Sequence, residues 1–107
     1  HLTDAPWLIV IFAERYGLNK DGSRRKNYYV NESVGIATGF LISAIHNAGL
    51  VCLTHTPNPM KFLNSMCLRP INEKPIMILP VGYASADATI PAASTSKKPL
   101  DEIMSVI

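Results

Sequence analysis

The sequence contains little cysteine and little histidine, and this scarcity limits the chemistry that it can support. Its 107 residues include two cysteines, Cys52 and Cys67, which have neither CxxC spacing nor histidines at metal-ligand spacing. We interpret them as a reduced cytosolic pair, because disulfides persist mainly in oxidising compartments. The three histidines, His1, His46 and His55, are scattered along the chain, so their spacing predicts no metal site.

An excess of charge and long apolar runs are also missing. A formal net charge of +2 provides no electrostatic case for nucleic acid or an anionic membrane as the main partner. The longest apolar run, residues 5–13, is well short of the roughly 18 residues that a membrane-spanning helix needs. The chain opens His1-Leu2-Thr3-Asp4, with no basic segment typical of a signal peptide. We expect it to be part of a longer chain, although mature proteins can also begin without methionine.

No catalytic motif of fixed spacing occurs in the sequence. A nucleophile elbow, a P-loop, a dinucleotide-binding glycine motif and HExxH are all absent. The eight acidic residues show no spacing that indicates a glycosidase pair. A composition of 48% apolar and 17% charged residues nevertheless predicts a packed globular chain of at most one domain.

Hydrophobic patterning predicts both strands and helices. The apolar runs 6–12 and 75–83 are typical of strands covered on both faces. Residues 50–53 are typical of a short third strand. The polar residues 16–26 contain two glycines and predict a surface loop, with its basic run Arg24-Arg25-Lys26 in solvent. Weaker patterns predict a helix of about two turns over residues 60–68, an extended arm over 84–96 and an amphipathic tail over 101–107.

The most periodic segment predicts a long helix, capped by Asn31 and ended by a left-handed Gly49. Its apolar residues fall on two faces, with Val34, Ala37, Leu41, Ala44 and Ala48 on one and Ile36, Phe40 and Ile45 on the other. Such a helix is buried on two sides, and Gly35 and Gly39 would let another backbone approach it closely. The rest of the chain cannot cover it, so we expect a partner, either a second copy or an absent N-terminal half.

One loop has the features of a ligand site. Thr54-His55-Thr56 follows a predicted strand and precedes two prolines, Pro57 and Pro59, so hydroxyls and backbone N–H groups gather at a strand end. The residues alone leave an alternative open, in which the threonines merely satisfy the local backbone.

Several blocks of residues resemble the iodotyrosine deiodinase branch of the FMN-dependent nitroreductase superfamily. They run in the family's order from one end of the chain to the other: residues 2–9, 31–34, 47–51, 54–57, 80–83, 87–91 and 98–104. The resemblance implies that residues 1–107 are the C-terminal portion of a nitroreductase-like FMN domain. The fold would be α+β, with a mixed sheet and a long central helix at a homodimer interface, where FMN binds.

The resemblance also implies roles for four residues. Thr56 would donate its hydroxyl to flavin N5 as the catalytic residue, because a donor there adjusts the electronics of the cofactor. Thr54 and His55 would line the ring edge; the animal enzymes have threonine where His55 stands, so we expect only its backbone to take part. Lys97 would bind the flavin phosphate in place of the animal enzymes' arginine, without its bidentate geometry. An exposed lysine of the C-terminal segment is the alternative.

The implied function is reductive removal of halide from halotyrosine, with electrons from an NAD(P)H-linked donor. A general FMN nitroreductase or quinone reductase acting on nitroaromatics, and an inactive fragment that only dimerises, are the alternatives. The family's phosphate loop and substrate lid would lie upstream of His1, so we expect weak FMN binding if the 107 residues are the whole polypeptide. A bacterial protein of this kind would be cytoplasmic, and an animal one would be anchored to a membrane through an upstream segment.

Overall fold

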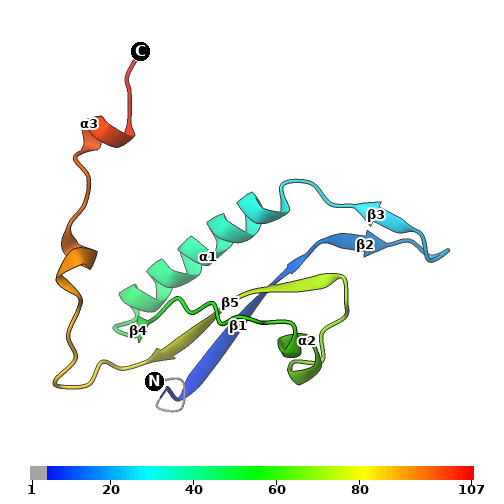
Figure 1. Ribbon diagram of the computed structural model, residues 1–107, viewed down its shortest axis with the longest axis horizontal. Coiled ribbons are helices and arrows are strands. Elements are labelled where there is room, and N and C mark those ends of the chain that lie inside the picture. The colour runs from blue at the N-terminus through cyan, green and yellow to red at the C-terminus, as the bar shows by residue number, and fades with distance from the viewer. Residues whose placement is uncertain (1–4) are drawn as a thin grey trace.

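A three-stranded antiparallel sheet forms the centre of the molecule. The computed structural model describes residues 5–107. Strand β1 (Trp7–Glu14) pairs with β5 (Glu73–Gly82), and β4 (Val51–Cys52) pairs with the other edge of β5. The order is therefore β1-β5-β4. Helix α1 (Val30–Asn47) runs across one face of this sheet, as Figure 1 shows. The α+β class expected from the sequence is confirmed, although both pairings in this sheet are antiparallel, so the described residues contain no mixed sheet.

The core lies between α1 and the sheet. Ile45 of α1 packs with Leu79 and Val81 of β5, and seven half-buried apolar residues surround them: Ile9, Ile11, Leu41, Ile42, Leu50, Cys52 and Met77. Residues 78–81 are buried in succession, so β5 is covered on both faces there, as predicted. Strand β1 differs from its prediction, because Trp7 and Leu8 at its start are exposed.

The predicted surface loop over residues 16–26 is wrong, because the segment forms a β-hairpin. Strands β2 (Tyr16–Leu18) and β3 (Arg24–Lys26) pair antiparallel across a turn at Asp21-Gly22. Gly22 has a φ of 86°, and the Asp21 carboxylate accepts hydrogen bonds from the backbone N–H and the hydroxyl of Ser23. Asp-Gly is a strong hairpin signal, which the polar composition obscured. The basic run is exposed, as expected.

Helix α1 begins two residues earlier than the predicted Asn31 cap implies. Tyr29, in the left-handed conformation at φ 55°, precedes the first turn, and no side chain caps it. The Asn31 cap is therefore wrong: Asn31 already lies inside the helix. The end of the helix is as predicted, since Gly49 has a φ of 81°, Gly49 N–H donates to His46 and Leu50 N–H donates to Ile45. These two bonds form a Schellman motif.

Much of α1 is open to solvent in the single chain. Ile36 is 63% exposed and Phe40 74%, and nothing lies within 4 Å of a Cβ placed at Gly35 or Gly39. The burial of α1 on two sides is therefore not met within the described residues. None of the helices among residues 5–107 is both long enough and apolar enough to cross a membrane.

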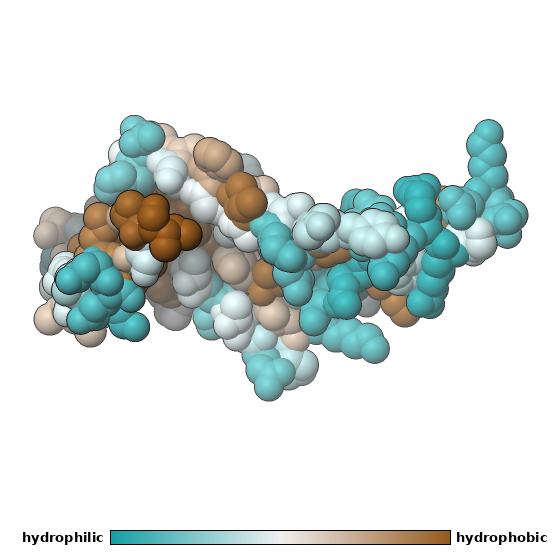
Figure 2. Space-filling view, turned by 90° about the horizontal axis from the view of Figure 1, so that it is seen from above, coloured by the Kyte–Doolittle hydropathy of each residue, from teal (hydrophilic) through white to brown (hydrophobic). Residues whose placement is uncertain are grey.

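The C-terminal quarter extends away from the sheet. Helix α2 (Phe62–Met66), which precedes β5, is shorter than predicted. An extended arm follows β5; it contains the 3-10 turn η1 (Ala92–Thr95) and leads to α3 (Leu100–Ile103). The radius of gyration is 17.4 Å, against about 13 Å for a compact domain of this length. In Figure 2 hydrophilic residues gather at the hairpin end and apolar ones toward the opposite end.

Candidate functional site

The Thr54–Thr56 loop is held against β5 by its backbone. Beyond β4, Leu53 N–H donates to the Pro80 carbonyl at 3.3 Å. His55 N–H then donates to the Ile78 carbonyl at 3.0 Å, and Ile78 N–H donates back to the His55 carbonyl at 2.8 Å. The loop therefore continues the pairing of β4 rather than leaving the sheet.

This pairing decides which side chains of the loop are presented to solvent. Side chains of extended backbone alternate between the two faces, so Thr54 and Thr56 share one face and His55 takes the other. Thr54 and Thr56 are exposed, and His55 is half-buried. Two hydroxyls thus stand on the same side of a backbone that is fixed between them, which suits recognition of one edge of a planar ligand.

Lys97 stands apart from this loop. It is exposed, it lies on the arm just before α3, and its side chain makes no hydrogen bond or ion pair with any described residue. Among residues 5–107, no backbone hydrogen bond joins the arm to Thr54 or Thr56. The structure therefore brings together Thr54, His55 and Thr56 but does not add Lys97 to them within one chain.

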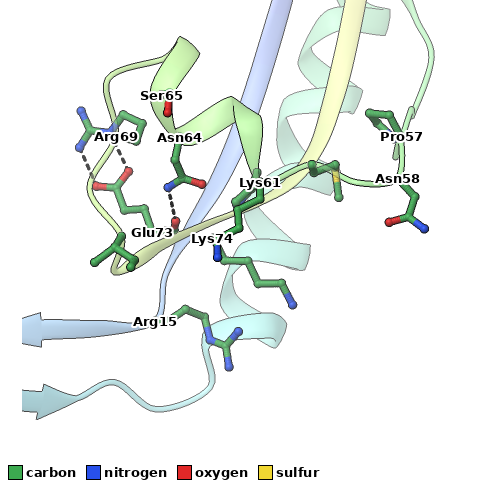
Figure 3. Close-up of a pocket in the computed structure, with 12 residues that line it drawn as sticks. Arg15, Pro57, Asn58, Lys61, Asn64, Ser65, Arg69, Glu73 and Lys74 are labelled. Atoms are coloured by element: carbon green, nitrogen blue, oxygen red, sulfur yellow. Dashed lines mark hydrogen bonds and ion pairs between the residues drawn. The ribbon is translucent and has the colours of Figure 1, made fainter.

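A cavity that the sequence analysis missed opens directly after the loop. Its volume is about 780 Å³. We call it the basic cavity, and Figure 3 shows its lining: Arg15, Pro57, Asn58, Met60, Lys61, Asn64, Ser65, Arg69, Ile71, Glu73, Lys74 and Pro75. These residues come from distant parts of the sequence, and the register of β1 on β5 brings Arg15 to this place. No pattern along the chain could have indicated it.

An ion pair and an amide form one wall of the basic cavity. Arg69 donates from Nε and Nη2 to the two carboxylate oxygens of Glu73, at 2.7 and 2.6 Å. This hydrogen-bonded guanidinium lowers the pKa of Glu73, and the carboxylate raises the pKa of Arg69. The Asn64 amide donates to the carbonyls of Pro70 and Glu73, at 3.0 and 2.8 Å, and so ties α2 to the start of β5.

Within residues 5–107 no three side chains of the kinds that bind metals lie close enough to hold an ion. Cys52 and Cys67 are both half-buried free thiols. The chemistry that the described residues offer is therefore hydrogen bonding from the loop hydroxyls and positive charge around the basic cavity.

Sequence comparison finds relatives of known function, although no family model matches the chain. It is 59% identical over 87 residues to an iodotyrosine deiodinase of Haliscomenobacter hydrossis, a match that covers 81% of the chain and 39% of that protein. It is 46% identical over 105 residues to the human iodotyrosine deiodinase 1, covering 97% of the chain and 36% of that protein. The chain thus spans less than two fifths of the length of these relatives.

Structural comparison points to the same family. An iodotyrosine deiodinase crystallised with FMN and 3-iodo-L-tyrosine matches this chain with a TM-score of 0.63 and 29% identity. The match covers 82% of this chain and 43% of the deiodinase chain. A nitroreductase family protein of Clostridium difficile matches 97% of the chain and 60% of its own, with a TM-score of 0.69; its 23% identity shows the fold alone. The chain therefore has a nitroreductase-like fold and resembles the iodotyrosine deiodinase branch of that superfamily.

Proposed function

We propose that the protein is an FMN-dependent oxidoreductase that removes halide from a halotyrosine by reduction. Similarity to iodotyrosine deiodinases at up to 59% identity supports the reaction class. The structural relative that carries FMN and 3-iodo-L-tyrosine supports the cofactor and the substrate class. The observation in this chain that carries the proposal is the Thr54–Thr56 loop. Its two threonines are exposed, and His55 between them exchanges two backbone hydrogen bonds with Ile78 of β5.

The loop residues fit a flavin. A flavin presents alternating hydrogen-bond acceptors and donors along one edge of a planar ring. The loop offers the hydroxyls of Thr54 and Thr56 on one face, while the N–H and carbonyl of His55 are already bonded to Ile78. Thr56 would donate its hydroxyl to N5, with Thr54 and the His55 backbone beside the same edge. Reduced FMN, when bound, would supply the two electrons of the reaction, in which a proton takes the place of the halogen on carbon and halide leaves.

Fixed geometry is the main contribution of the chain at this point. A hydroxyl on a mobile loop would lose conformational freedom on binding, whereas the His55–Ile78 bridge has already removed that freedom. A preorganised donor next to the reacting ring stabilises developing charge without reorganisation during the reaction.

Lys97 is the proposed phosphate ligand. Its ammonium group is exposed and has no counterion among the described residues, so it is available to an anion. Lysine provides a point charge rather than a fork, so the contact would be less directional than one from arginine. Because Lys97 does not contact the loop of its own chain, it would complete the site from the partner in a homodimer or after the arm moves.

The proposed homodimer involves the open face of α1. Ile36 and Phe40 are exposed, and Gly35 and Gly39 leave room for a second backbone.

An NAD(P)H-linked reductant is the proposed electron source. A general FMN nitroreductase is the second candidate, because the hydroxyls of Thr54 and Thr56 would contact the flavin and by themselves select no substrate.

Turnover measurements on the full-length protein distinguish these functions. The protein, reconstituted with FMN and supplied with a chemical reductant, is assayed separately with diiodotyrosine and with a nitroaromatic. We expect iodide release that requires FMN. Reduction of the nitroaromatic without any iodide release would contradict the deiodinase proposal and favour the second candidate. A protein that dimerises but binds no FMN would contradict both.

A further inference from the structure

The basic cavity has an excess of positive charge that nothing in the described chain neutralises. Of its four cations, Arg69 is paired with Glu73. The side chains of Arg15, Lys61 and Lys74 make no hydrogen bond or ion pair with any described residue. Arg15 directly follows β1, Lys61 directly precedes α2, and Lys74 lies at the start of β5. In Figure 3 the Arg15 and Lys74 side chains extend on one side of the cavity, and the Arg69–Glu73 pair lies on the other.

The remaining lining is largely apolar. Pro75 is buried and Met60 and Pro57 are half-buried, while Ile71 is exposed at the rim. A volume of about 780 Å³ is within the range of cavities that hold small organic molecules. An inorganic anion would satisfy the cations but would leave the apolar wall in water. The cavity is therefore complementary to a molecule with both an anionic group and an apolar body.

We propose that the basic cavity binds a small organic anion, a carboxylate or phosphate ester carried on an aromatic ring. The anionic group sits among Arg15, Lys61 and Lys74, and the ring packs on Met60 and Pro75. The Arg69–Glu73 pair and the Asn64 amide hold the opposite wall in place, so little order has to be created on binding.

This site does not rest on the proposed flavin function. The cavity lies beyond Pro57, on the α2 side of the Thr54–Thr56 loop, and shares no residue with that loop. A chain without any FMN can therefore be used to test it, and the two proposals can fail independently.

Binding of defined probes by the FMN-free protein provides the test. Calorimetric titrations compare 1-naphthyl phosphate, 1-naphthoate, inorganic phosphate and uncharged 1-naphthol at low ionic strength. We expect both naphthyl anions to bind more tightly than inorganic phosphate or naphthol, because only they contact both walls. Equal affinity for inorganic phosphate, or for naphthol, would overturn the proposal of an organic anion.

Single-charge variants locate the site. Lys74→Gln and Arg15→Gln are each expected to raise the Kd of 1-naphthyl phosphate about fivefold, the scale of one exposed ion pair. Lys20→Gln removes the same charge from the exposed turn of the β2–β3 hairpin, outside the cavity, and is the matched control. Thr56→Val tests for a shared site. If Lys20→Gln or Thr56→Val raised the Kd of 1-naphthyl phosphate as much as the cavity variants do, the anion would bind elsewhere and the proposal would be overturned.

Discussion

His55 and Ile78 exchange two backbone hydrogen bonds, His55 N–H to the Ile78 carbonyl at 3.0 Å and Ile78 N–H to the His55 carbonyl at 2.8 Å. Ile78 is buried in the central strand, so the bridge connects the candidate site to the best-packed part of the fold. A histidine can occupy this position because the connection is made by the backbone. The neighbouring threonines are thereby presented with little freedom to move.

Thr56→Val tests the proposed contact with the flavin. The substitution removes a hydroxyl from an exposed residue and keeps the side-chain shape, so the fold is expected to remain. We expect the rate of FMN-dependent iodide release to fall at least about tenfold, the scale of one hydrogen bond to a charged group. Thr89→Val makes the same change on the arm and serves as the control. An unchanged rate in Thr56→Val would remove Thr56 from the reaction.

Gly49→Ala tests the end of α1. Gly49 has a φ of 81°, which an alanine adopts only at a cost of about 1–2 kcal/mol. We expect the free energy of unfolding to fall by about that amount in a urea titration. No loss of stability would show that the Schellman motif contributes nothing to the stability of this helix.

Gly39→Ala tests the open face of the same helix, and here we expect the free energy of unfolding to rise. Gly39 lies inside α1, and a Cβ there would meet nothing within 4 Å. Alanine is expected to raise the stability of the isolated chain by about 0.5–1 kcal/mol, since it costs less entropy in a helix. The same methyl group is expected to weaken self-association in sedimentation measurements. Unimpaired association would contradict the use of this face by a second copy.

Glu73→Gln tests the ion pair beside the basic cavity. The hydrogen-bonded Arg69 lowers the pKa of Glu73 below its ordinary value of 4.5. A lowered folded-state pKa means that the pair stabilises the fold above pH 4.5 and that this contribution is lost as the pH falls through the folded-state pKa. Because the Arg69 side chain is 47% exposed, solvent screens the pair, and we expect a contribution of less than about 1 kcal/mol.

The measurement for Glu73→Gln is the free energy of unfolding against pH, compared with the unsubstituted chain. The difference between the two proteins is expected to be largest near neutral pH and to disappear as the pH falls below 4.5. A difference that stayed constant over this range would show that the carboxylate charge has no part in it.

Elements with a strong local signal were predicted well. The end of α1 followed from Gly49, because a left-handed residue is needed there and glycine adopts it without strain. Strand β5 followed from its unbroken apolar run. The β2–β3 hairpin did not, because its composition is polar and matches that of a loop, and this outweighed the Asp21-Gly22 turn signal. The start of α1 depends on the left-handed Tyr29, for which the sequence has no signal.

For the candidate site too, some features follow from the local sequence and others only from the tertiary structure. The sequence by itself determined which residue types stand at the strand end and, through resemblance, that Thr54, His55 and Thr56 belong together. Only the tertiary structure decided that His55 is bonded to Ile78, that Lys97 lies apart and that Arg15 meets Lys61 and Lys74 around one cavity. Local chemistry is carried by neighbours along the chain, whereas these relationships depend on strand register between residues dozens of positions apart.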